Sequence, residues 1–172
     1  MTDTRLPLEE APSIVTGEDL ADLLGRQHSE LRTLLCRVPL LHDGAREDVF
    51  LRARRLLAVH LELETELLLP GLDRVPADFR LDEEVVAAER EGLESIDFDA
   101  ALARVAVAFL RHVGVLEGVR LRGQLSPPAG EAVAAAIRLW DGRGDAYLGN
   151  TWSDMVATVS EQVVSGADSA SR

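Results

Sequence analysis

Three of the four histidines in this chain fall at positions where a helix would turn them towards a core. In the segment AVHLELETELLLPGL, His60 and Glu64 are four residues apart, so a helix places both side chains on one face, about one turn apart. The same face carries leucines, so both polar groups are expected to point inward. A buried imidazole and a buried carboxylate are costly unless they are paired or bound to a metal.

Two further histidines lie on apolar stripes of other predicted helices. His28 lies between leucines of an earlier stripe, and His112 lies between Phe109 and Leu116 of a later one. A single inward histidine is more often a core residue with an ordinary hydrogen-bond partner, and a His and a Glu four residues apart more often form a local hydrogen bond. Inward histidines on three helices nevertheless favour a metal site. Metal sites in helical bundles use inward His and Glu side chains from facing helices, and this mixed set suits iron, manganese or zinc. The predicted metal ligands are His28, His60, Glu64 and His112.

The spacing of apolar residues predicts the helices that position these groups. We expect long helices over about 16–38, 46–69, 82–95 and 97–121, followed by shorter ones over about 130–139 and 152–164. Thr16, followed three residues later by an acid, predicts a capping box at the first helix start, and Pro70-Gly71 predicts the end of the second helix. His42 falls in a turn and is expected on the surface. Short connections between long helices favour an all-α, up-down-up-down four-helix bundle.

The predicted organisation has three parts. Residues 1–15 form an N-terminal arm, residues 16–125 form the four-helix bundle, and residues 126–172 form a C-terminal helical extension with a polar tail. The extension is expected to pack on the outside of the bundle, or to mediate formation of a homo-oligomer.

The composition restricts the classes of partner. The 172 residues carry a formal charge of −12, which argues against nucleic acid because binding phosphates needs a basic face. No apolar run reaches the ~20 residues of a membrane span, and the first residues lack the features of a signal peptide, so we expect a cytoplasmic protein without a membrane partner. The single Cys36 cannot form an internal disulfide, and its apolar neighbours predict that it is buried.

Two segments resemble a known family. HLELETELLLP resembles the second-helix signature of hemerythrin-like (HHE) cation-binding domains, and RQHSELRTLL resembles the first His motif of that family. The resemblance extends over residues 18–122. It implies a four-helix bundle with two irons that binds O₂, or that responds to oxygen, nitric oxide or iron.

The second half of the chain departs from the family pattern. When AEREGLESI is aligned with RQHSELRTL, Arg90 stands where a ligand His is expected, and Leu116 takes the expected Glu position, one residue before Glu117. A guanidinium cannot ligate a cation. Three options follow: one metal on the four predicted ligands; two metals, with Glu89, Glu91 or Glu117 substituting after a register shift; or no metal, with Arg90 paired to Glu64.

The leading functional hypothesis is a non-haem metal protein, with iron as the metal, that binds or activates a small diatomic ligand. One alternative is a metal-free bundle with a regulatory or assembly role, which could use Trp140, Tyr147 and Trp152 as a contact surface. Another is a redox enzyme that acts on a small molecule.

Overall fold

Most of the residues that the structure describes are helical, and there is no strand among them. The structure is a computed structural model that describes residues 16–68, 81–93, 95–116, 126–142 and 151–169. The helices are α1 (Gly17–Arg37), α2 (Asp43–Leu63), α3 (Leu81–Glu91), α4 (Ile96–Leu116), α5 (Pro127–Trp140) and α6 (Trp152–Ser169). A 3-10 turn, η1 (Val38–Leu40), follows α1, and a π-helical turn, η2 (Glu64–Leu68), continues α2. The predicted all-α class is therefore confirmed, and the predicted arm lies outside the described residues.

The first helix begins where its capping signal predicts. The backbone N–H of Asp19 donates to Thr16 Oγ1 (3.1 Å), and the backbone N–H of Thr16 donates to Asp19 Oδ2 (3.0 Å). This reciprocal pair satisfies two amide groups that have no partner within the helix. The helix ends at Arg37, directly before the 3-10 turn that contains Pro39.

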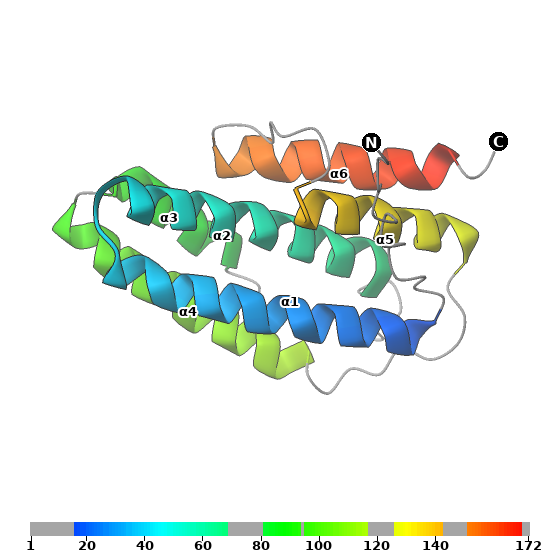
Figure 1. Ribbon diagram of the computed structural model, residues 1–172, viewed down its shortest axis with the longest axis horizontal. Helices are drawn as coiled ribbons and strands as arrows, with labels where there is room; N and C mark the ends of the chain where they lie inside the picture. The colour runs from blue at the N-terminus through cyan, green and yellow to red at the C-terminus, as the bar shows by residue number, and fades with distance from the viewer. Residues whose placement is uncertain (1–15, 69–80, 94, 117–125, 143–150, 170–172) are drawn as a thin grey trace, which may run out of the picture.

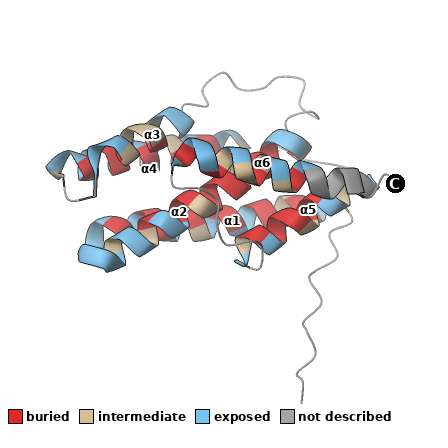
Figure 2. Cartoon of the chain, turned by 90° about the horizontal axis from the view of Figure 1, so that it is seen from above, coloured by how far each residue is buried: buried red, intermediate tan, exposed pale blue. Residues whose placement is uncertain are grey.

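Helix α2 lies at the centre of the fold. It contacts α1 on one side and both α5 and α6 on the other, while α3 and α4 pair with each other and α4 also contacts α1 (Figure 1). Buried residues line the faces that the helices turn towards one another, and exposed residues cover the outer faces (Figure 2). One continuous apolar core joins all six helices. None of the described helices is long and apolar enough to cross a bilayer.

The C-terminal helices are anchored to the rest of the chain by polar contacts as well as by the core. The buried guanidinium of Arg54 on α2 pairs with Glu89 on α3, and Glu89 also accepts from the backbone N–H of Trp152 at the start of α6 (2.9 Å). Trp152 is itself buried, and Trp140 Nε1 donates to Glu30 on α1 (3.0 Å). These two indoles therefore pack within their own chain.

Two expectations from the sequence are wrong, one about the burial of Cys36 and one about the end of the third helix. Cys36 is exposed, because it falls on the outer face of α1 next to the exposed Arg37. The third helix ends at Glu91, four residues earlier than expected, where Gly92 adopts a positive φ of 73°. A left-handed residue of this kind commonly ends a helix.

Candidate metal centre

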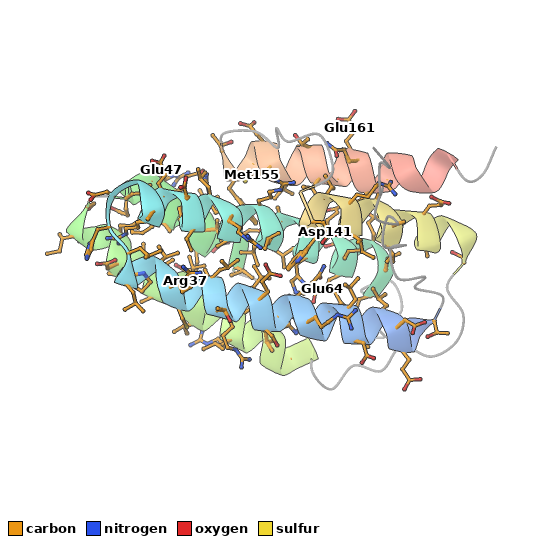
Figure 3. The ribbon with its side chains drawn as sticks, viewed as in Figure 1. Arg37, Glu47, Glu64, Asp141, Met155 and Glu161 are labelled. Atoms are coloured by element: carbon orange, nitrogen blue, oxygen red, sulfur yellow. The ribbon has the colours of Figure 1, made fainter. Side chains whose placement is uncertain are left out.

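The four predicted ligands come together in the interior from three helices. His28 lies on α1, His60 on α2, Glu64 at the start of the π-helical turn and His112 on α4, and all four are buried. One potential ligand atom from each lies within 4.8 Å of the others. Figure 3 shows Glu64 in the interior between the ribbons of α1 and α2. The prediction that these four side chains point into one shared interior region is confirmed, and His42 is exposed as expected.

The carboxylate of Glu64 lies at the centre of this cluster. Its Oε1 is 3.1 Å from His60 Nε2 and 3.6 Å from His28 Nε2, and its Oε2 is 2.8 Å from His112 Nε2. The imidazole rings are set edge to face, with centroids 4.6 Å apart for His28 and His60 and 5.6 Å apart for His60 and His112. All three histidines therefore present the same ring nitrogen to one carboxylate.

Several of these converging atoms approach closely without good hydrogen-bond geometry. His28 Nε2, His60 Nε2 and both oxygens of Glu64 are buried and have no well-formed hydrogen bond to any described residue. Buried polar atoms nearly always have a partner, and leaving them without one costs free energy. A cation bound between the nitrogens and the carboxylate would satisfy them together, so these residues fit a metal ion.

The central ligand lies where α2 changes into a π-helical turn. The backbone changes from α-helix to π-helix at Glu64, so this residue lies at the junction between the two geometries. Short π-helical segments occur frequently at functional sites. The turn still leaves Glu64 one turn beyond His60, and their side chains meet.

The pKa shifts of His60 and Glu64 favour the ionisation states that metal ligation requires. Burial lowers the pKa of His60, which favours its neutral imidazole. Burial acts to raise the pKa of Glu64, but His60, His112 and His28 outweigh it and hold that pKa well below its usual range. Neutral imidazole and ionised carboxylate are the forms that bind metals.

These shifts predict that the metal-free protein loses stability in acid. An unfolded chain protonates His60 below about pH 6.5, whereas the folded chain resists that proton because its pKa is lower. The stability is therefore complete above about pH 6.5 and falls as the pH drops towards the folded pKa, by up to about 1.4 kcal/mol per pH unit for one proton. The lowered pKa of Glu64 adds a loss of the same sign below about pH 4.3.

Urea unfolding of chelator-treated protein at pH 7.5, 6.5 and 5.5 measures this dependence. The free energy of unfolding should decrease down the series, and His60→Leu should flatten the decrease between pH 6.5 and 5.5. Stability that is constant or rises on acidification would contradict the neutral state of His60.

Gln27 is a residue of the site that the sequence analysis missed. Its side chain is buried, and its Oε1 lies 3.0 Å from His60 Nδ1. An amide oxygen only accepts, so Nδ1 carries the proton and the lone pair of Nε2 is left facing Glu64. Hydrogen bonds of this kind orient metal-binding histidines. Its position in the sequence could have identified it, because Gln27 lies between Leu24 and Leu31 on the buried stripe of α1.

We expect Gln27→Leu to weaken metal binding by about 10- to 100-fold, because His60 would lose the acceptor that fixes its tautomer. Gln27→Glu keeps an acceptor at this position and should recover most of the affinity. Competition against a chromophoric chelator measures the three affinities. Arg26→Leu, a change at the exposed neighbouring position, is the control. Equal loss in Gln27→Leu and Arg26→Leu would show that Gln27 has no special role.

Arg90 does not face the site. It is exposed, so the option in which Arg90 pairs with Glu64 is wrong, and Glu64 meets three histidines instead. Helix α3 ends at Glu91, so Arg90 lies in its exposed last turn. The inner face of α3 carries the apolar residues Leu81, Val85 and Ala88.

Two of the three proposed substitute ligands, Glu89 and Glu91, do not contribute to the cluster. Glu89 is held by Arg54 and the backbone of Trp152, and Glu91 is exposed. Glu117 and the side chain of Leu116 lie outside what the structure describes. Neither Glu89 nor Glu91 is therefore available as a ligand for a second metal.

Comparison of the chain with protein-family models, with curated proteins and with solved structures finds no match. The chemistry of the site therefore has to be argued from its own residues.

Proposed function

We propose that the protein is a hemerythrin-like non-haem metal-binding protein, in which residues 16–125 form the four-helix bundle and hold the metal. The ligands in this proposal are His28, His60, Glu64 and His112. The observation that carries it is the buried convergence of three imidazole nitrogens on one carboxylate, with ligand atoms within 4.8 Å of one another. The resemblance of the segments around His28 and His60 to hemerythrin-like motifs supports the same assignment.

The donor set favours one transition-metal ion. Three imidazoles and one carboxylate suit iron, manganese or zinc rather than the oxygen-rich sites of calcium or magnesium. Iron is proposed first because of the hemerythrin-like motifs. One ion is proposed because the inner face of α3 is apolar in the described part of the chain.

The surroundings favour a small diatomic ligand. The four ligand residues are at most 8% exposed, so a bulky organic substrate has little access to them. Phe109 adds an apolar wall, with its ring 6.0 Å from that of His28 and stacked at 6.3 Å on His112. Iron bound here would supply the capacity to bind or reduce O₂ or NO, and the chain's own residues would hold the ion, exclude bulk water and keep the His60 imidazole neutral.

A metal-free cluster is the second candidate. The 2.8 Å approach of His112 Nε2 to Glu64 Oε2 favours it, because a protonated imidazole and a carboxylate could neutralise each other without a metal. In that case the bundle would have a structural or regulatory role.

Metal analysis distinguishes the two candidates. Protein purified without oxygen should contain close to one transition-metal ion per chain, with iron retained in preference to zinc and manganese when all three are supplied. The visible absorption spectrum should change when O₂ or NO is added to the iron form. A metal content near zero, unchanged after incubation with each of the three metals, would reject the proposal in favour of the metal-free cluster.

A further inference from the structure

A second site lies outside the metal centre, in a groove between α3 and α6. The groove has a volume of about 690 Å³, and part of its lining comes from Glu62 of α2. Val86 of α3 and Val156 of α6 contribute apolar side chains, and Arg90 of α3 adds a cationic group. Its volume falls within the range of about 300–1,000 Å³ that is typical of small-molecule sites.

A buried carboxyl group lines the groove. Glu62 is 8% exposed, and it lies half a helical turn away from the face that carries His60 and Glu64. Its hydrogen-bond partner is the hydroxyl of Ser160. A carboxylate can accept about four hydrogen bonds, and burying one is costly unless it is paired. This group therefore has unused capacity for a cationic donor within the groove.

Two more carboxylates increase the negative charge of the groove. Asp82 and Glu83 lie at the start of α3, and the indole N–H of Trp152 donates to Asp82 Oδ1 (3.1 Å). Asp82 also interacts electrostatically with His112, so this part of the groove lies near the metal centre without contributing a ligand to it. An ammonium group would find several acceptors here, whereas a ligand bearing only anionic groups would be repelled.

The guanidinium of Arg90 supplies the opposite charge. It is exposed and forms no ion pair or hydrogen bond within the part of the chain that the structure describes. Arg46, Arg54 and Arg104 differ, since each has a carboxylate partner. A guanidinium binds carboxylates in a bidentate manner, so Arg90 is available to hold an acid group of a ligand.

We propose that this groove binds a small zwitterionic molecule, with an ammonium group at Glu62, a hydrocarbon segment along Val86 and Val156, and a carboxylate at Arg90. Each part of the ligand matches one part of the lining. The site uses none of the metal ligands, so it does not depend on the proposed metal function.

Calorimetric titration with three probes of similar length tests the proposal. ε-Aminocaproate carries both charged groups, hexylamine lacks the carboxylate and hexanoate lacks the ammonium. The zwitterion should bind at least about tenfold more tightly than either of the others, because each lost group removes a charge-assisted hydrogen bond. The titrations are repeated with γ-aminobutyrate, a shorter zwitterion, to test the effect of ligand length. They are also repeated with chelator-treated protein, in which the preference for the zwitterion over the singly charged probes should persist.

Two variants assign the groups. Arg90→Gln should abolish the preference for ε-aminocaproate over hexylamine, and Glu62→Gln should abolish its preference over hexanoate. Glu161→Gln and Arg138→Gln, at exposed positions outside the groove lining, should retain both preferences. Figure 3 shows Glu161 on the outer side of α6.

Several results would overturn the proposal. They are the absence of binding by either zwitterion, equal affinity for ε-aminocaproate and hexylamine in the parent protein, or unchanged preferences in Arg90→Gln. Arg90 is exposed, so its replacement should leave the fold intact and this arm of the test remains decisive even if Glu62→Gln unfolds. If the parent protein binds the zwitterion but binds no metal, the proposed metal function is rejected and this inference stands.

Discussion

His60→Ala should reduce metal affinity by at least about 100-fold, a larger loss than expected from removing a residue that only orients a ligand. His60 is fully buried, it lies 3.1 Å from the central carboxylate, and Gln27 fixes its orientation. Alanine would remove one of three nitrogen donors and leave a cavity that water can enter. Metal content after dialysis, together with competition against a chelator of known affinity, measures the change.

His42→Ala is the matched control for this experiment. His42 is exposed at the start of α2, away from the cluster, so its loss should leave metal content and affinity unchanged. Equal losses in the two variants would mean that the metal binds adventitiously through surface histidines. Retention of full affinity in His60→Ala would contradict the assigned ligand set.

Glu64→Ala should destabilise the metal-free protein by about 3–5 kcal/mol, because a buried donor would lose its acceptor and a cavity would form in the core. The carboxylate is 2% exposed and is the group on which the three histidines converge. Without it, His112 Nε2 would lose the carboxylate oxygen that lies 2.8 Å away, and a cavity would form in the core. The midpoint of urea unfolding should fall with little change in the slope.

Glu66→Ala tests whether this effect is specific to the cluster. Glu66 lies in the same π-helical turn but is exposed, so its replacement should change the free energy of unfolding by no more than about 0.5 kcal/mol. In the parent protein, added metal should raise stability by about 4 kcal/mol at a thousandfold excess over Kd. Glu64→Ala should lose most of this increase, whereas Glu66→Ala should keep it. Equal destabilisation in the two variants would show that the loss of stability comes from changing the π-helical turn and not from removing the Glu64 carboxylate.

The local sequence was sufficient to predict the elements and the inward direction of the main ligands. The capping box at Thr16 and Asp19 involves residues three apart, and the His60–Glu64 spacing places two side chains on one helical face. Both features depend on interactions within one or two helical turns, so the surrounding fold has little influence on them. His28 and His112 were predicted for the same reason, because each lies on an apolar stripe that must be buried.

Only the tertiary structure decided which side chains meet across helices. The direction of Arg90 depended on where α3 ends, and the pairing of Gln27 with His60 depended on how α1 lies against α2. The groove beside Glu62 likewise exists because α6 packs against α2 next to α3. The rotation and spacing of packed helices follow from filling the whole core, to which every helix contributes, and no short segment of sequence contains that information.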